Sequence, residues 1–188
     1  MNKLLLSLTC SALATSTSYG ILNIDFTESG ADLVVTYSGS HDTWATTYTK
    51  SELNASIVGT TATLSFAQAR DTGSFEEYEI NGVDLTTPVP WDGLGLIAEG
   101  GSASGHAGMG HISDLSRLVL FAPSGYTAGE TIFATSTLSN VSLTDAFDAA
   151  EISAGSGTIT FSGGADAVSY THLRAPRDGA TSRMPSSA

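Results

Sequence analysis

Apolar and polar residues alternate along much of the chain after residue 20. In ILNIDFTE (residues 21–28) every second residue is apolar, and LVVTYSGS (residues 33–40) repeats the alternation after the turn sequence ESGAD. A period of two is typical of a strand with one buried face, because successive side chains point to opposite sides. The two runs and the turn between them therefore predict a β-hairpin.

Similar runs recur along the chain, separated by Gly, Asn, Asp, Ser and Pro. They cover residues 44–49, 56–66, 76–80, 94–98, 117–121, 131–138 and 157–161. Only TDAFDAAEI (residues 144–152) predicts a short helix, with Thr144 as its N-cap. Many short strands without a long helix predict an all-β fold. We expect an antiparallel β-sandwich or jelly-roll-like single domain over residues 21–167.

Residues 1–20 have the pattern of a secretory signal peptide. Lys3 supplies a positive start, LLLSLTCSALA supplies a short apolar run, and small residues follow it. The run is too short for a stable membrane-spanning helix. Cys10 is the only cysteine, so removal of the signal would leave a mature chain without disulfides. This segment predicts a secreted or cell-surface location.

The net charge of the chain limits the classes of molecule that it can bind. The formal net charge is −12, and residues 21–167 hold only three basic residues, Lys50, Arg70 and Arg117. Binding to nucleic acid or to an anionic lipid surface needs clustered Lys and Arg. The composition therefore excludes nucleic acid as a partner and favours a solvated acidic surface.

The sequence EGGSASGHAGMGHISD (residues 99–114) holds weak candidates for a metal site. His106, His111 and Asp114 carry imidazole and carboxylate groups that bind transition metals, and Met109 lies between the histidines. A five-residue spacing on a Gly-rich segment fixes no geometry, however, and ordering a mobile loop costs entropy. We expect a flexible surface loop here, with no metal and no cofactor bound.

Acidic residues cluster around a predicted hairpin. Glu77, Glu79 and Asp84 are weak candidates for Ca²⁺, which prefers hard oxygen ligands supplied by loops. Alternation places Glu77 and Glu79 on one face and Glu76 on the other, and no calcium-loop spacing is present. The favoured interpretation is a solvated acidic edge that discourages strand pairing.

No pattern typical of an active site stands out. The serines form no G-x-S-x-G sequence, and His41-Asp42 follows SGS in a predicted turn. Trp44, Tyr48, Trp91 and Tyr126 could stack on sugars if they were exposed together, although aromatic residues in strands are more often core. We therefore expect no enzyme.

Two stretches carry a resemblance to a known group of proteins. IDFTESGADLVVTYSGS (residues 24–40) and LVLFAPSGYTAGETIFATSTLSNVSL (residues 118–143) resemble segments of exported bacterial proteins with a PEP-CTERM sorting signal. In the second stretch Pro123, Gly125, Tyr126 and Gly129 hold the matching places. The resemblance implies recognition by an exosortase, and delivery to the cell surface or to an extracellular polysaccharide matrix.

The last residues differ from the rest. VSYTHLRA (residues 168–175) is what the codons GTC TCT TAT ACA CAT CTC CGA GCC encode, which resembles the end of a transposase-based sequencing library. SRMPSSA (residues 182–188) resembles a flow-cell adapter in the same way. We interpret residues 168–188 as a non-native disordered tail, a translated adapter, that does not pack into the sheet. The gene would then be truncated before its sorting signal, and a membrane contact would depend on the missing C-terminal anchor.

These observations predict a secreted, cell-surface or matrix-associated protein of structural or adhesive type. The alternative is a carbohydrate- or calcium-binding β-sandwich module, which needs exposed aromatic rings or converging acids. The pattern leaves open the partner, the oligomeric state and the true C-terminus.

Overall fold

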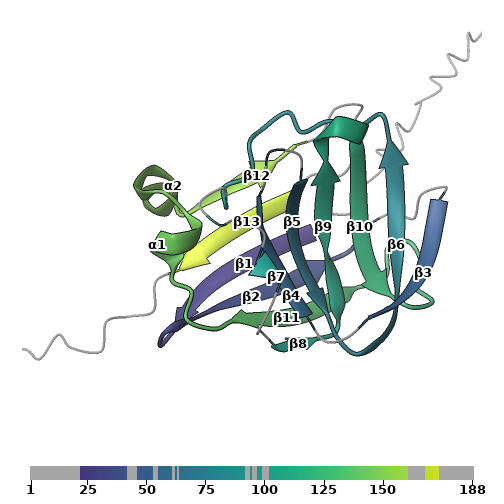
Figure 1. Ribbon diagram of the computed structural model, residues 1–188, viewed down its shortest axis with the longest axis horizontal. Coiled ribbons are helices and arrows are strands. Elements are labelled where there is room, and N and C mark those ends of the chain that lie inside the picture. Colours follow the sequence, from purple (N-terminus) through teal and green to yellow (C-terminus); the bar gives the residue numbers. More distant parts are fainter. Residues whose placement is uncertain are drawn as a thin grey trace, which may run out of the picture.

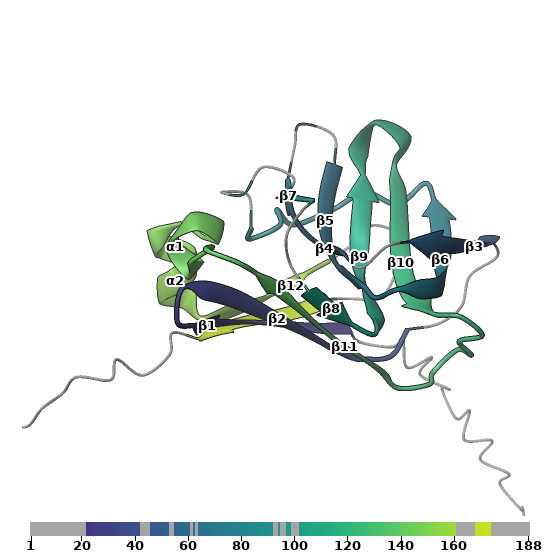
Figure 2. The same ribbon diagram turned by 60° about the horizontal axis from the view of Figure 1, so that its bottom comes forward.

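The chain folds into two facing β-sheets. The computed structural model describes residues 22–41, 46–52, 55–60, 62, 64–91, 94, 97–98, 102–160 and 168–173. Two short helices lie at one end of the sandwich, and the strands of one sheet cross those of the other (Figures 1 and 2). The predicted all-β sandwich is confirmed. Among the described residues, no helix is long and apolar enough to cross a membrane.

The six-stranded sheet has the order β12-β13-β1-β2-β11-β8. Its strands are β1 (Leu22–Ser29), β2 (Asp32–Gly39), β8 (Ser102–Ser104), β11 (Ile132–Leu138), β12 (Ser156–Ile159) and β13 (Val168–Leu173). The hairpin expected from the first two runs is present, with Asp25 opposite Thr36. Gly30 has φ +67° in its turn, a conformation that glycine adopts without steric cost.

The seven-stranded sheet has the order β3-β6-β10-β9-β5-β4-β7. Its strands are β3 (Thr46–Glu52), β4 (Ala55–Thr60), β5 (Leu64–Arg70), β6 (Gly73–Asn81), β7 (Ile97–Ala98), β9 (His106–Ile112) and β10 (Arg117–Pro123). The run predicted at 56–66 is thus divided between two paired strands, β4 and β5. A 3₁₀ turn, η1 (Ser113–Leu115), joins β9 to β10.

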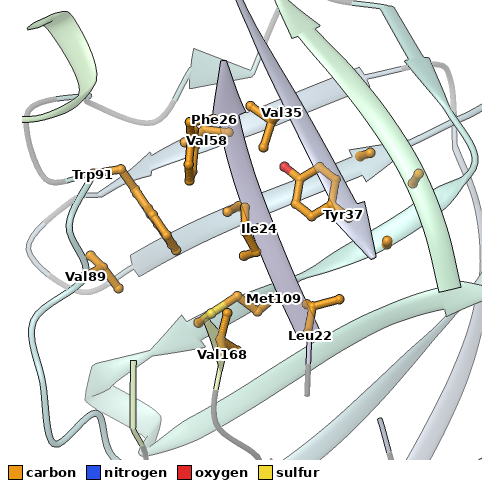
Figure 3. Close-up of a cluster of buried hydrophobic side chains, with 14 of the residues drawn as sticks. Leu22, Ile24, Phe26, Val35, Tyr37, Val58, Val89, Trp91, Met109 and Val168 are labelled. Atoms are coloured by element: carbon orange, nitrogen blue, oxygen red, sulfur yellow. The ribbon is translucent and has the colours of Figure 1, made fainter. Parts of the chain in front are cut away.

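The core lies between the sheets, where every second side chain of each strand points inward. From β1, Leu22, Ile24 and Phe26 are at most 2% exposed; Met109 lies near Leu22 and Val168, and Phe26 lies near Val58 (Figure 3). Many of the inward residues of the seven-stranded sheet are alanines, which lets the larger side chains of β1 and β2 fill the space. Without a disulfide among the described residues, this packing must hold the sandwich together.

The segment 99–114 was expected to be a flexible loop, and this prediction is wrong for its described part, residues 102–114. Residues His106–Ile112 form β9, a strand between β5 and β10 near the middle of the sheet. Its glycines allow close contact with β5: a Cβ on Gly108 would lie 2.3 Å from the carbonyl oxygen of Ala67. A Cβ on Gly110 would lie 2.2 Å from the ring of Phe66. Glycine here reflects close approach and not mobility.

The expectation that residues 168–188 stay outside the sheet is wrong for their first six residues. Val168–Leu173 form β13, which pairs in parallel with β1 and antiparallel with β12. The segment alternates as a strand does: Val168 is 1% exposed in the core, whereas Ser169 and Thr171 face outward. The ring of Tyr170 lies over Gly157 of β12, where a Cβ would be 2.3 Å from the tyrosine oxygen. Residues 174–188, like the predicted signal at 1–20, lie outside the described residues.

The single helix expected at 144–152 is two helices. Helix α1 (Leu143–Ala146) begins after Ser142, and α2 (Ala149–Ala154) begins after Asp148; each cap forms a capping box. Phe147 separates them with an extended backbone, because its side chain is buried edge-on against Phe26 at 4.9 Å. Packing of one aromatic side chain thus overrides the helical pattern.

Candidate functional site

The three transition-metal candidates are not brought together. His106 and His111 lie on β9 five residues apart, so they point to opposite faces of the sheet, and Asp114 is exposed in η1. Within the described parts of the chain, no group of three His, Cys, Asp or Glu residues could hold a metal ion. Both histidines are buried, at 8% and 3% exposure, which the loop interpretation did not anticipate.

His111 has a structural role on the inner side of β9. Its Nε2 lies 3.1 Å from the carbonyl oxygen of Val83 and 4.0 Å from Oδ1 of Asp84. These contacts fasten the segment that follows β6 to the sheet. Asp84, a calcium candidate, therefore lies beside a histidine.

His106 lies on the outer side of β9, within a small aromatic cluster. The centres of the His106 and Phe75 rings lie 5.4 Å apart in a stacked arrangement. The guanidinium carbon of Arg70 lies 6.0 Å from the centre of the Phe75 ring. Burial lowers the pKa of His106, and the nearby carboxylate of Asp71 opposes that shift only in part. The folded chain therefore favours the neutral imidazole.

The position of His106 predicts a loss of stability on mild acidification. An unfolded histidine takes up a proton near pH 6.5, whereas folded His106 does so only at lower pH. The contribution of neutral His106 to stability is therefore fully present above about pH 6.5. It is lost as the pH falls through the lower pKa that this histidine has in the folded chain. The midpoint of urea unfolding, measured between pH 7.5 and 5, should fall less in His106→Asn than in the unchanged chain. An equal fall in both would contradict the assignment.

The acids of β6 form ion pairs and hydrogen bonds that hold neighbouring strands. Glu77 and Glu79 share one face, as alternation predicts, and Nη1 of Arg117 lies 3.1 Å from Oε2 of Glu79. On the other face, Glu76 accepts hydrogen bonds from the hydroxyl of Tyr78 and, at 2.9 Å, from the amide of Gly125. The calcium candidates thus do not converge in this part of the structure.

The aromatic candidates for sugar stacking are buried where they can be described. Trp91 is fully buried, and its ring lies 5.6 Å from that of Phe26. The hydroxyl of Tyr126 lies 2.7 Å from the carbonyl oxygen of His41 and 3.0 Å from its amide nitrogen, which ties the β10–β11 turn to the end of β2. Trp44 and the side chain of Tyr48 lie outside the described residues.

A different surface emerges on the outer side of the six-stranded sheet, which we name the hydroxyl face. Its side chains follow the alternation of six strands and are mostly Ser and Thr. They are Asn23, Asp25, Thr27, Ser29, Asp32, Val34, Thr36, Ser38, Ser102, Ser104, Phe133, Thr135, Thr137, Ser156, Thr158, Ser169 and Thr171. Fifteen of these seventeen are polar, and the two that are ionisable at neutral pH, Asp25 and Asp32, are both acidic.

Strand pairing aligns these side chains in rows across the sheet. One row runs from Ser104 through Thr135, Thr36, Asp25 and Thr171 to Ser156. Neighbouring strands lie about 4.8 Å apart, so hydroxyl groups recur at roughly that interval along the row. The seven-stranded sheet covers the opposite side, and no described element crosses this one (Figure 2).

Part of the hydroxyl face could have been predicted from the sequence. In NIDFT and VTYS every second residue is polar, and these residues are Asn, Asp, Thr or Ser. FATST does not alternate in this way, because its outward residues are Phe133, Thr135 and Thr137 and its inward Ser136 is also polar. What the sequence does not give is the order of the strands, which brings β11 and β13 onto the β1–β2 hairpin.

No family model, curated protein or solved structure matches this chain.

Proposed function

We propose that this protein is exported and acts outside the cell as a structural or adhesive component, without catalysis. The observation that supports the proposal most directly is that side chains with reactive groups make structural contacts between segments of the fold. His111, Glu76 and Arg117 each contact a backbone group or a charge on another segment, and they thereby fasten loops and strands. The hydroxyl face presents polar groups that are suited to contact with other molecules.

Export follows from residues 1–20 and is tested with a reporter. Residues 1–40 fused to an alkaline phosphatase that lacks its own signal should give phosphatase activity in a bacterial host, because that reporter needs disulfides formed outside the cytoplasm. The matched control is the fusion of residues 21–40. If the longer fusion is no more active than the control, the proposed location is wrong.

The absence of catalysis is tested separately on the purified full chain. We expect no turnover of chromogenic esters, glycosides or peptides above the rate of a heat-denatured sample. Turnover that survives repeated purification and is lost with the folded state would replace the structural role with an enzymatic one.

The alternative, a ligand-binding module, keeps support only in its carbohydrate form. The described acids do not converge as Ca²⁺ ligands do. The aromatic residues that sequence reasoning singled out are buried at Trp91 and Tyr126. Among the described residues, the hydroxyl face is the surface that we propose for sugar binding.

A further inference from the structure

We infer that the hydroxyl face binds an extended, neutral polysaccharide, with Phe133 as the stacking surface and the Ser/Thr rows as hydrogen-bonding partners. This inference rests on the proposed function, because it needs the chain to meet such a polymer outside the cell. It adds the binding surface, the class of ligand and the residues that make contact.

Phe133 has a position that packing within the domain does not require. It lies on β11 with its side chain outward and is 64% exposed, the most exposed large apolar residue in the described structure. It stands directly opposite Ser38, which is followed across the sheet by Asn23 and Ser169. An aromatic ring that ends a row of polar groups offers an apolar surface for sugar C–H groups beside partners for sugar hydroxyls.

The ring of Phe133 lies past the end of the pairing between β8 and β11. Gly105 follows the end of β8 with φ +80°, and a Cβ there would lie 2.7 Å from the carbonyl oxygen of Phe133 and 3.2 Å from the Cβ of buried Ala134. Glycine there allows the two backbones to approach on the core side of β11, opposite to the ring. Strand β8 pairs with β11 only from Thr135 onward, so the ring lies beyond that pairing.

The charge of the face decides between classes of polymer. Asp25 accepts a hydrogen bond from the hydroxyl of Thr171, and no basic side chain belongs to the described rows. An anionic polymer would meet this carboxylate and a chain of net charge −12, without a cation to pair with. A neutral polymer avoids that repulsion, and its hydroxyl groups can exchange water for Ser and Thr hydroxyls.

A second copy of this chain fits the face less well. Stable interfaces between proteins need apolar area in their buried core. The described rows supply two apolar side chains, Val34 and Phe133, among seventeen. Burying two such faces against each other would desolvate many hydroxyl groups for little apolar contact.

The test is cosedimentation of the purified full chain with insoluble cellulose and chitin, and with calcium-alginate beads as the anionic comparison. We expect binding to at least one neutral polymer and weaker binding to alginate. Phe133→Ala should weaken binding to the neutral polymer about tenfold, because the ring is the stacking surface of the proposed site. The matched control is Leu115→Ala, which truncates the other exposed large apolar residue, 55% exposed in η1, and should leave binding unchanged.

A second variant keeps the test independent of any effect of Phe133 on folding. Thr36→Val and Thr135→Val together keep the shape of two paired side chains and remove their hydroxyls. This double variant should also bind several-fold more weakly, with an unchanged melting temperature. The inference is overturned if no neutral polymer binds, if alginate binds more tightly, or if both variants bind like the unchanged chain. It is also overturned if Phe133→Ala abolishes self-association instead. None of these outcomes changes the export or turnover results, so failure here is distinguishable from failure of the proposed function.

Discussion

Gly108→Ala should lower the free energy of unfolding by about 4 kcal/mol or more, which places it among the most damaging single substitutions. A methyl group at this position would lie 2.3 Å from the carbonyl oxygen of Ala67 and 2.5 Å from the Cα of Gln68. Both contacts involve the backbone of β5, which cannot move without separating two paired strands. The φ of +138° adds strain for any residue with a Cβ. Urea unfolding of the purified chain, followed by circular dichroism, measures the loss.

Gly129→Ala is the matched control for this substitution. Gly129 also has a positive φ, +80°, but a Cβ there would meet nothing within 4 Å. It should cost only the backbone term, on the order of 1 kcal/mol. Equal losses at the two positions would show that β9 does not lie against β5 as described.

Trp91→Ala should cost about 3 to 5 kcal/mol, the range for removal of a large buried aromatic side chain. Trp91 is fully buried and packs against Phe26, whose ring in turn contacts Phe147 ahead of α2. The substitution therefore opens a cavity where the segment after β6 meets β1 and the helices. Thermal unfolding monitored by calorimetry measures the effect.

Trp91→Phe separates the loss of packing from the loss of the indole group. The Nε1 of Trp91 makes no hydrogen bond within the structure, so its removal leaves no partner unsatisfied. We expect Trp91→Phe to cost well under half as much as Trp91→Ala. If Trp91→Ala leaves the free energy of unfolding nearly unchanged, the side chain of Trp91 does not lie in the core.

The sequence predicts the hairpin and the fold class because one face of each strand is buried. The alternation in residues 22–27 and 33–38 is regular, and the core residues Ile24 and Val35 are those that alternation selects. β-branched residues and turn residues agree with this pattern, so local and global preferences coincide. The resemblance to exported proteins with a sorting signal remains a prediction.

The strand β9 could not be predicted in the same way. GHAGMGHI combines glycine, histidine and alanine, which give no alternation of hydrophobicity. Its place in the sheet depends on the neighbours β5 and β10, because Gly108 and Gly110 fit against residues distant in sequence. A glycine-rich segment has the same composition whether it is mobile or tightly packed.

The position of β13 was missed for a different reason. We predicted a disordered tail because residues 168–175 and 182–188 resemble translated adapter sequence, although Val168 and Tyr170 alternate with polar residues as in a strand. The partner of the segment is β1, more than 140 residues earlier, and local sequence carries no signal for that parallel pairing. The full hydroxyl face could not be predicted for the same reason, because it forms only when β11 and β13 lie on either side of the β1–β2 hairpin.

The central claim is that the hydroxyl face is the surface through which this protein contacts a polymer. Its most direct test is a titration of the ¹⁵N-labelled full chain with soluble cello- and chito-oligosaccharides, followed by amide chemical shifts. The account predicts shifts concentrated on β1, β2 and β11, around Thr36, Phe133 and Thr135, which are lost in Phe133→Ala. Shifts concentrated instead around His106 and Phe75 on the outer side of the other sheet, or none with either oligosaccharide, would contradict it.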